Sequence, residues 1–129
     1  MSEEPIVQID HVGPATVVTM LTPELLEDRV IIRLEDALIS LAYEEPGRHL
    51  VLDFCNVRML SSSLLGLLIR LKKMVTEQHG RLLVCCIRSE VTNTPHDKYV
   101  YELLKIVRLD SVFEICDSVP QALAKLGLA

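Results

Sequence analysis

The sequence predicts a single α/β domain over residues 1–129, with a mixed β-sheet of about four to five strands and about four helices packed mainly on one face. Half of the residues are apolar, which is enough to fill a core. Strand-like and helix-like patterns alternate along the chain, as is typical of α/β folds. The length suits one domain and is too short for two ordinary ones.

The first third of the chain predicts a hairpin and a long helix. Two β-rich runs, Pro5–Asp10 and Ala15–Leu21, flank the breaker pair Gly13-Pro14, so they should form an antiparallel hairpin. Thr22-Pro23-Glu24 predicts a helix start, because Thr can cap, Pro suits the first helical position and an acid complements the helix dipole. Apolar residues at helical spacing extend this helix to about Ala42.

The middle third predicts a strand–helix–strand unit. His49–Cys55 is a nearly continuous apolar run, which is typical of a central parallel strand covered on both faces. Ser61–Glu77 is the predicted second helix, and Gly80 stops it. Arg81–Ile87 is another buried strand, so the unit should be a right-handed crossover.

The last third predicts a loop, a helix, a short strand and a closing helix. Arg88–Lys98 is polar and contains a Thr-Pro pair, so we expect a loop. Tyr99–Val107 should be the third helix, and Ser111–Cys116 should hold a short strand. Pro120–Leu126 is the predicted terminal helix, with Ser118 or the adjacent turn as its cap.

Charge and hydropathy exclude two classes of partner. The formal net charge is -5, whereas nucleic-acid binding needs a basic surface. The basic cluster at Arg70, Lys72 and Lys73 is better explained as a solvated helix face. The run Leu64–Leu71 is interrupted by Arg70 and is far shorter than the ~20 residues that span a bilayer. The N-terminus is acidic where a signal peptide would be basic, so we expect a cytoplasmic protein.

No pattern in the sequence indicates a metal, a cofactor or an enzyme. We expect the four cysteines to be small, buried and reduced; they are Cys55, Cys85, Cys86 and Cys116. The histidines lack metal-ligand spacing; they are His11, His49, His79 and His96. A hydrolase would pair His96 and Asp97 with a serine, but neither a Gly-x-Ser-x-Gly elbow nor a glycine-rich phosphate loop is present.

Three consecutive serines, Ser61, Ser62 and Ser63, open the predicted second helix after a buried strand and a turn. A helix N-terminus has unpaired amide groups and a partial positive charge, so it suits an anion or a phosphate carried by a serine. Helix capping alone accounts for one of the three serines. Asp53, inside the preceding strand, should accept backbone N–H groups near this turn and orient it.

The segment around the serines resembles the signature of STAS domains, whose founding members are the anti-sigma factor antagonists. Leu52-Asp53-Phe54 resembles the family's strand, Val57 its turn, and Ser61–Gly66 its Asp-Ser-Ser-Gly-Leu-Gly helix start. Further segments resemble the family in order along nearly the whole chain; they are His79-Gly80-Arg81-Leu82, Leu109–Ile115 and Val119–Leu126.

The resemblance implies a phosphorylation switch. In the family, the second signature serine is phosphorylated by a partner kinase that is also the anti-sigma factor, and this serine corresponds to Ser63, with Ser61 and Ser62 beside it. The unphosphorylated domain would bind the kinase and release the sigma factor. The signature departs at two positions, because Ser61 replaces Asp and Leu64 replaces Gly, which makes the helix start bulkier beside the phosphoacceptor.

The predicted partner contacts lie on the same helix and turn. They are Leu64, Leu65, Ile69 and Arg58, and we expect partial exposure of Leu65 and Ile69 to form an apolar docking patch. Two alternatives stay open. The domain could serve as a scaffold or a homo-oligomerising module without phosphorylation, or as a regulator that binds a small ligand or nucleotide.

Overall fold

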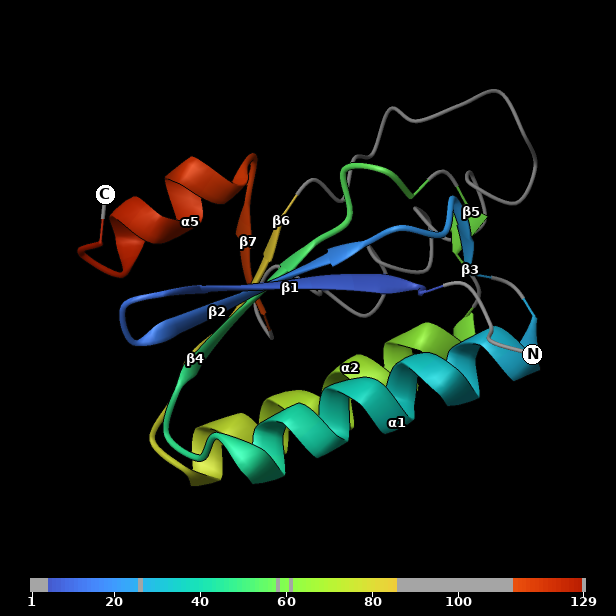
Figure 1. The fold of residues 1–129 in the computed structure, drawn as a ribbon, viewed down its shortest axis with the longest axis horizontal. Coiled ribbons are helices and arrows are strands. Elements are labelled where there is room, and N and C mark those ends of the chain that lie inside the picture. The colour runs from blue at the N-terminus through green and yellow to red at the C-terminus, as the bar shows by residue number, and fades with distance from the viewer. Residues whose placement is uncertain (1–4, 26, 58, 61, 86–112, 129) are drawn as a thin grey trace.

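The computed structural model describes residues 5–25, 27–57, 59–60, 62–85 and 113–128, without the side chains of residues 59, 60 and 62. Its centre is a five-stranded sheet with the strand order β1-β2-β4-β6-β7 (Figure 1). The strands are β1 (Val7–Val12), β2 (Ala15–Met20), β4 (His49–Asp53), β6 (Leu82–Cys85) and β7 (Glu114–Cys116).

The sheet is mixed, as the sequence predicts. β1 and β2 form an antiparallel hairpin, in which Val12 pairs with Ala15 around Gly13. Gly13 has a φ of 56°, which a tight turn requires and glycine adopts without strain. β2, β4, β6 and β7 then run parallel to one another. The predicted hairpin, the central strand and the mixed α/β class are therefore confirmed.

Helices α1 (Asp28–Glu44) and α2 (Ser62–Glu77) lie side by side on one face of the sheet, here called the first face (Figure 1). Their apolar sides bury a large aliphatic core against the sheet, including Leu34, Leu38, Leu52, Leu67 and Leu71. No helix in the described ranges is long and apolar enough to cross a membrane.

The prediction that the first helix starts at Thr22-Pro23-Glu24 is wrong. The chain at Glu24–Leu25 is a short strand, β3, which pairs in parallel with β5 (Met59–Leu60). Leu25 is buried, so the extended backbone places an apolar side chain in the core and overrides the local capping signal. α1 begins at Asp28, after Glu27, whose φ of -78° and ψ of 136° are extended.

The opposite, or second, face is covered by α5 (Val119–Lys125). Its core is smaller and includes Val17, Val51, Leu83 and Ala122. Ser118 caps this helix as predicted, because its hydroxyl accepts the Gln121 N–H at 3.2 Å. The described residues thus contain two helices on one face and one on the other. The predicted loop 88–98 and helix 99–107 lie outside them.

The end of α2 packs closely against the start of β4. His79 has a φ of 67°, its N–H donates to the Thr76 carbonyl at 3.0 Å, and the Gly80 N–H donates to the Val75 carbonyl at 2.9 Å. This hydrogen-bond pattern is a Schellman C-cap with histidine in the left-handed position. Gly80 is buried, and a Cβ added there would lie 2.4 Å from the Arg48 carbonyl oxygen.

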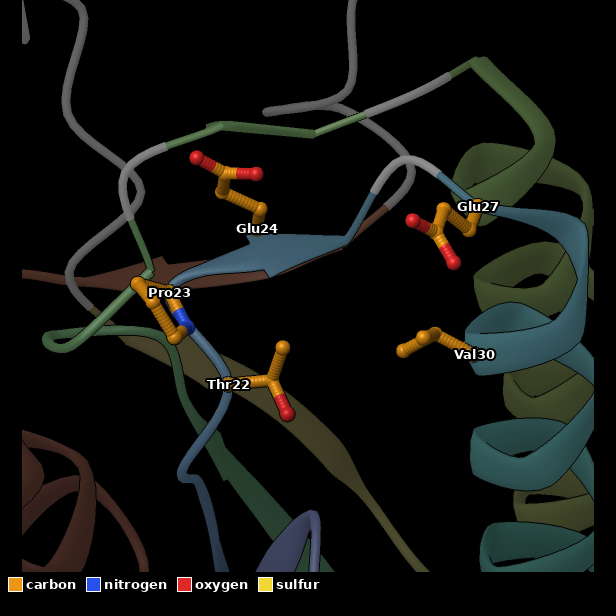
Figure 2. Close-up of a pocket in the computed structure, with 5 residues that line it drawn as sticks. All are labelled: Thr22, Pro23, Glu24, Glu27 and Val30. Carbon is orange, nitrogen blue, oxygen red and sulfur yellow. The ribbon is translucent and has the colours of Figure 1, made fainter.

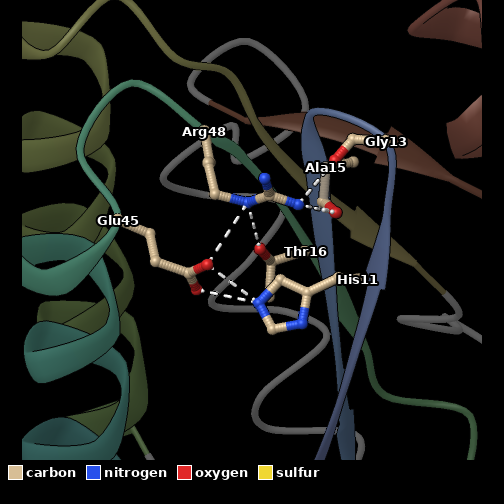
Figure 3. A network of polar contacts seen from close by, with 6 residues as sticks. All are labelled: His11, Gly13, Ala15, Thr16, Glu45 and Arg48. Atoms are coloured by element: carbon tan, nitrogen blue, oxygen red, sulfur yellow. Dashed lines mark hydrogen bonds and ion pairs between the residues drawn. The ribbon is translucent and has the colours of Figure 1, made fainter.

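A polar network built on Arg48 joins the hairpin to the loop after α1 (Figure 3). Arg48 donates through Nε to Thr16 Oγ1 at 2.8 Å and through Nη2 to the carbonyls of Gly13 and Ala15, both at 2.7 Å. Glu45 accepts from His11 Nε2 at 2.9 Å and lies 3.7 Å from Arg48 Nε. Thr16 is fully buried, so Arg48 supplies the donor that its hydroxyl needs.

Candidate functional site: the serine turn

The turn between β4 and α2 is held by its own hydrogen bonds. The Asp53 carboxylate accepts the Cys55 N–H at 2.9 Å, and the Val57 N–H donates to the Phe54 carbonyl at 2.9 Å. Phe54 is buried in the first-face core. Asp53 therefore accepts a backbone N–H in this turn, as predicted, and its orientation of the serines stays a prediction.

Ser63 is exposed in the first turn of α2, one residue after the helix begins. The adjacent Leu64 is fully buried, and Leu67 and Leu68 continue the buried side of the helix. Because these leucines face the core, the backbone of the first turn presents Ser63 to solvent. Ser61 and Arg58 lie outside the described residues, as does the side chain of Ser62.

Two of the predicted partner contacts, Leu64 and Leu65, are wrong, and the docking patch loses Leu65. Leu64 and Leu65 are 0% and 8% exposed, so their side chains belong to the first-face core. Both point inward because α2 lies on the sheet beside α1, and at ~100° per residue the buried leucines of its first turns span an arc of about 160° that includes them. Ile69 is 54% exposed and remains accessible to a partner.

The outer side of α2 beside Ser63 carries Gly66 and Arg70. At ~100° per residue these three positions fall on one narrow face of the helix. Arg70 Nε donates to Glu35 Oε2 of α1 at 3.0 Å, and the Arg70 side chain is 59% exposed. This confirms that Arg70 belongs to a solvated helix face, and the pair joins the two helices across their groove.

An acidic pocket that the sequence analysis missed lies at the same end of the molecule (Figure 2). It has a volume of about 220 Å³ and is lined by Thr22, Pro23, Glu24, Glu27 and Val30. Because β3 pairs with β5, which directly precedes α2, both glutamates lie near the start of that helix. A two-residue strand carries no periodicity, so no sequence signal could have found this arrangement.

The cysteines fall into two classes. Cys85 and Cys116 are free and buried, as predicted, and they lie opposite each other on β6 and β7. Burial, followed by the charges of Cys116 and Asp53, raises the pKa of the Cys85 thiol to about 12, and burial also raises the pKa of Cys116. Such thiols are poor nucleophiles.

The expectation for Cys55 is wrong, because this residue is exposed and disulfide-bonded. It lies two residues beyond the end of β4, in the turn that leaves the sheet, so its side chain is not enclosed by the core. The fourth cysteine, Cys86, lies outside the described residues.

Within the described ranges, no group of three or more His, Cys, Asp or Glu side chains could hold a metal ion. Two of the described histidines make polar side-chain contacts. His11 bonds to Glu45, and His49 Nδ1 accepts the Arg81 N–H at 3.0 Å. His96 lies outside the described part of the chain.

A profile of the STAS domain matches residues 10–122, which is most of the chain. The chain belongs to the STAS domain family. The match begins within β1 and covers β2, the serine turn, both first-face helices and the beginning of α5.

Solved structures show that this STAS domain shares its fold with anti-sigma factor antagonists. An antagonist STAS domain protein from Planctomyces limnophilus matches with a TM-score of 0.74 and 17% identity, over 94% of this chain and 97% of that one. An antagonist from Mycobacterium paratuberculosis matches with a TM-score of 0.70 and 19% identity, over 92% and 91%. The Bacillus cell fate determinant SpoIIAA, in its phosphorylated form, matches with a TM-score of 0.65 and 12% identity, over 93% and 98%.

Proposed function

We propose that this STAS domain is a regulatory protein-binding domain that binds a serine kinase acting as an anti-sigma factor, and that phosphorylation of Ser63 switches this binding. It acts by binding and not by catalysis. The proposed site of action is the cytoplasm, where the Cys55 disulfide would be open to reduction. The observation that carries the proposal is the exposure of Ser63 in the first turn of α2.

A phosphate on Ser63 is compatible with the fold. α2 has 16 residues, and the amide groups and positive dipole end of its first turn favour a nearby anion. A phosphoserine carries about -1.5 to -2 charges at neutral pH. The expected effect of phosphorylation is therefore a change in the surface charge of this turn and not a loss of the helix.

The surroundings of Ser63 explain how such a charge would release a partner. Gly66 leaves the same helix face without a side chain, so a partner can approach closely there, and the exposed Ile69 adds an apolar contact beside it. Glu24 and Glu27 already make this end of the molecule acidic. A dianion added to a contact surface must be desolvated or repelled, and both effects weaken binding.

The replacement of the signature glycine by Leu64 does not obstruct this site. Sequence reasoning expects a bulkier helix start, but the Leu64 side chain is fully buried and adds nothing to the surface that a kinase would meet. The related fold of Bacillus SpoIIAA has been solved in a phosphorylated form, which supports phosphate uptake by a domain of this architecture.

The first test is the intact mass of the protein after incubation with ATP and candidate partner kinases. We expect a gain of one phosphate, retained by Ser61→Ala and Ser62→Ala and lost by Ser63→Ala. If no candidate kinase adds a phosphate, the phosphorylation switch is refuted and the domain is better described as a scaffold.

The second test is partner binding by charge-mimicking variants. Ser63→Asp should lose roughly tenfold or more in affinity for the kinase, whereas Ser63→Ala should bind like the wild type. Thr76→Asp is the matched control, because Thr76 is also exposed on α2 but lies in its last turn. Equal binding by Ser63→Asp and Ser63→Ala would contradict the proposal, as would equal losses in Ser63→Asp and Thr76→Asp.

A further inference from the structure

The outer side of α1 carries an apolar stripe that faces away from the sheet. Ile32 is 56% exposed and Tyr43 is 71% exposed, which are the highest values among the large exposed apolar side chains of the described residues. Ile39 is half-buried and Asp36 is exposed. At ~100° per residue these four positions fall within an arc of roughly 60°, and the stripe runs about 16 Å along the helix.

Charges of opposite sign lie along one flank of this outer stripe. Arg29 lies on that flank near the start of α1, and Glu44 lies on it at the end. Both side chains are exposed, and neither has an ion pair or a side-chain hydrogen bond within the described part of the chain. The flank is therefore basic at one end and acidic at the other.

The charges on this flank would pair with those of an identical helix that runs in the opposite direction. We propose that the outer stripe of α1 binds a second copy of this chain, with the two α1 helices antiparallel about a two-fold axis near Asp36 and Ala37. A two-fold axis brings the same flank of both helices together in opposite directions. Ile32 of each copy then packs near the partner's Tyr43, and Arg29 of each copy lies near the partner's Glu44.

The same geometry predicts a weak dimer. One helix from each copy offers less area than the ~1,600 Å² of a standard interface, so the dissociation constant should be on the order of micromolar or weaker. The two copies of Asp36 lie near the axis, where like charges oppose association. Asp36→Asn should therefore tighten the dimer. This inference does not depend on phosphorylation of Ser63.

The test is sedimentation velocity of the full chain from about 5 μM to 500 μM, with wild type and variants compared at each concentration. Ile32→Asp and Tyr43→Asp should each raise the dissociation constant roughly tenfold or more, since each substitution acts twice in the dimer. The matched control is Ile69→Asp, because Ile69 is 54% exposed on α2 but lies off the stripe.

A charge exchange makes the test specific for the orientation of the helices. Arg29→Glu alone should weaken the dimer, and the double variant with Arg29→Glu and Glu44→Arg should restore it. Circular dichroism establishes that each variant is folded. A monomeric wild type at 500 μM, a loss in Ile69→Asp equal to that in Ile32→Asp, or no rescue by the double variant would overturn the proposal.

Discussion

Gly80 offers a sharp test of how α2 is joined to the sheet. It follows the left-handed His79 at the end of α2, and its N–H is bonded to the Val75 carbonyl. A Cβ at this position would lie 2.4 Å from the Arg48 carbonyl oxygen and 3.0 Å from Val75 Cγ1. The oxygen belongs to the backbone just before β4, so it cannot turn aside as a flexible side chain could.

The expected cost of Gly80→Ala follows from this geometry. The backbone of Arg48 and the turn at Gly80 must separate by at least about 0.6 Å, and overpacking of this kind costs about 1–3 kcal/mol. The lower entropy of alanine in the unfolded chain offsets about 0.4–1 kcal/mol. We expect a net loss of about 1–2 kcal/mol in the free energy of unfolding.

Gly66→Ala is the matched control, because it makes the same chemical change on the same helix. A Cβ at Gly66 would meet only the Arg70 guanidinium, at 3.5 Å, which is an ordinary contact. Alanine in a helix interior is favoured over glycine by about 0.5–1 kcal/mol, so this variant should be more stable than the wild type.

Urea denaturation followed by circular dichroism measures both variants. With a slope near 2 kcal/mol/M, the midpoint should fall by about 0.5–1 M in Gly80→Ala and rise by about 0.3–0.5 M in Gly66→Ala. If Gly80→Ala unfolds at the same urea concentration as the wild type, Gly80 does not lie as close to the Arg48 carbonyl as described. The packing of this turn against the start of β4 would then be contradicted as well.

Two further predictions concern titratable groups. Arg81 donates hydrogen bonds to the Glu114 carboxylate, one of them 2.9 Å from Nε to Oε2, and these lower the pKa of Glu114 in the folded state. The pair therefore stabilises the protein above the unfolded pKa of ~4.3 and ceases to do so as pH falls through the folded pKa. Urea midpoints of the wild type and Glu114→Gln should therefore differ at pH 7, and the difference should shrink as pH falls below ~4.3; a difference independent of pH would contradict the ion pair. Because Cys85 is buried and its pKa is raised to about 12, iodoacetamide at pH 8 should alkylate this thiol only as fast as the protein unfolds. Peptide mass mapping measures the rate of alkylation. Rapid labelling of the native protein would show that Cys85 is not buried.

The parts of the fold that local patterns specify were predictable from the sequence. The apolar run 49–55 and the helical spacing of 61–77 match β4 and α2 closely, because each core-facing side chain follows from the period of its own element. The start of α1 was not predictable in this way. There the pairing of β3 with β5, 35 residues further on, outweighs the capping signal of Thr22-Pro23.

The placement of the serine turn at the start of α2 was predictable, but the surface around it was not. The resemblance of the signature indicates Ser63, and the structure finds it exposed. The burial of Leu65 depends on how α2 lies beside α1 and on the sheet, which helical spacing does not contain. No sequence pattern indicated Arg48 either, because its role is to donate a hydrogen bond to Thr16 on β2, 32 residues earlier in the chain.

The assignment of the two sheet faces to different parts of the chain has a consequence during synthesis on the ribosome. Once Cys85 has emerged, the chain holds α1, α2 and most of the core between them and the sheet, although Phe113 is still to come. The partners of Val17, Val51 and Leu83 on the second face include Cys116 and Ala122, which come about 30–40 residues later. At a synthesis rate of about 5–20 residues per second, the apolar second face stays without these residues for roughly 2–8 s. The nascent chain thus passes through a stage in which the apolar second face is exposed, and such transiently exposed surface is prone to aggregation.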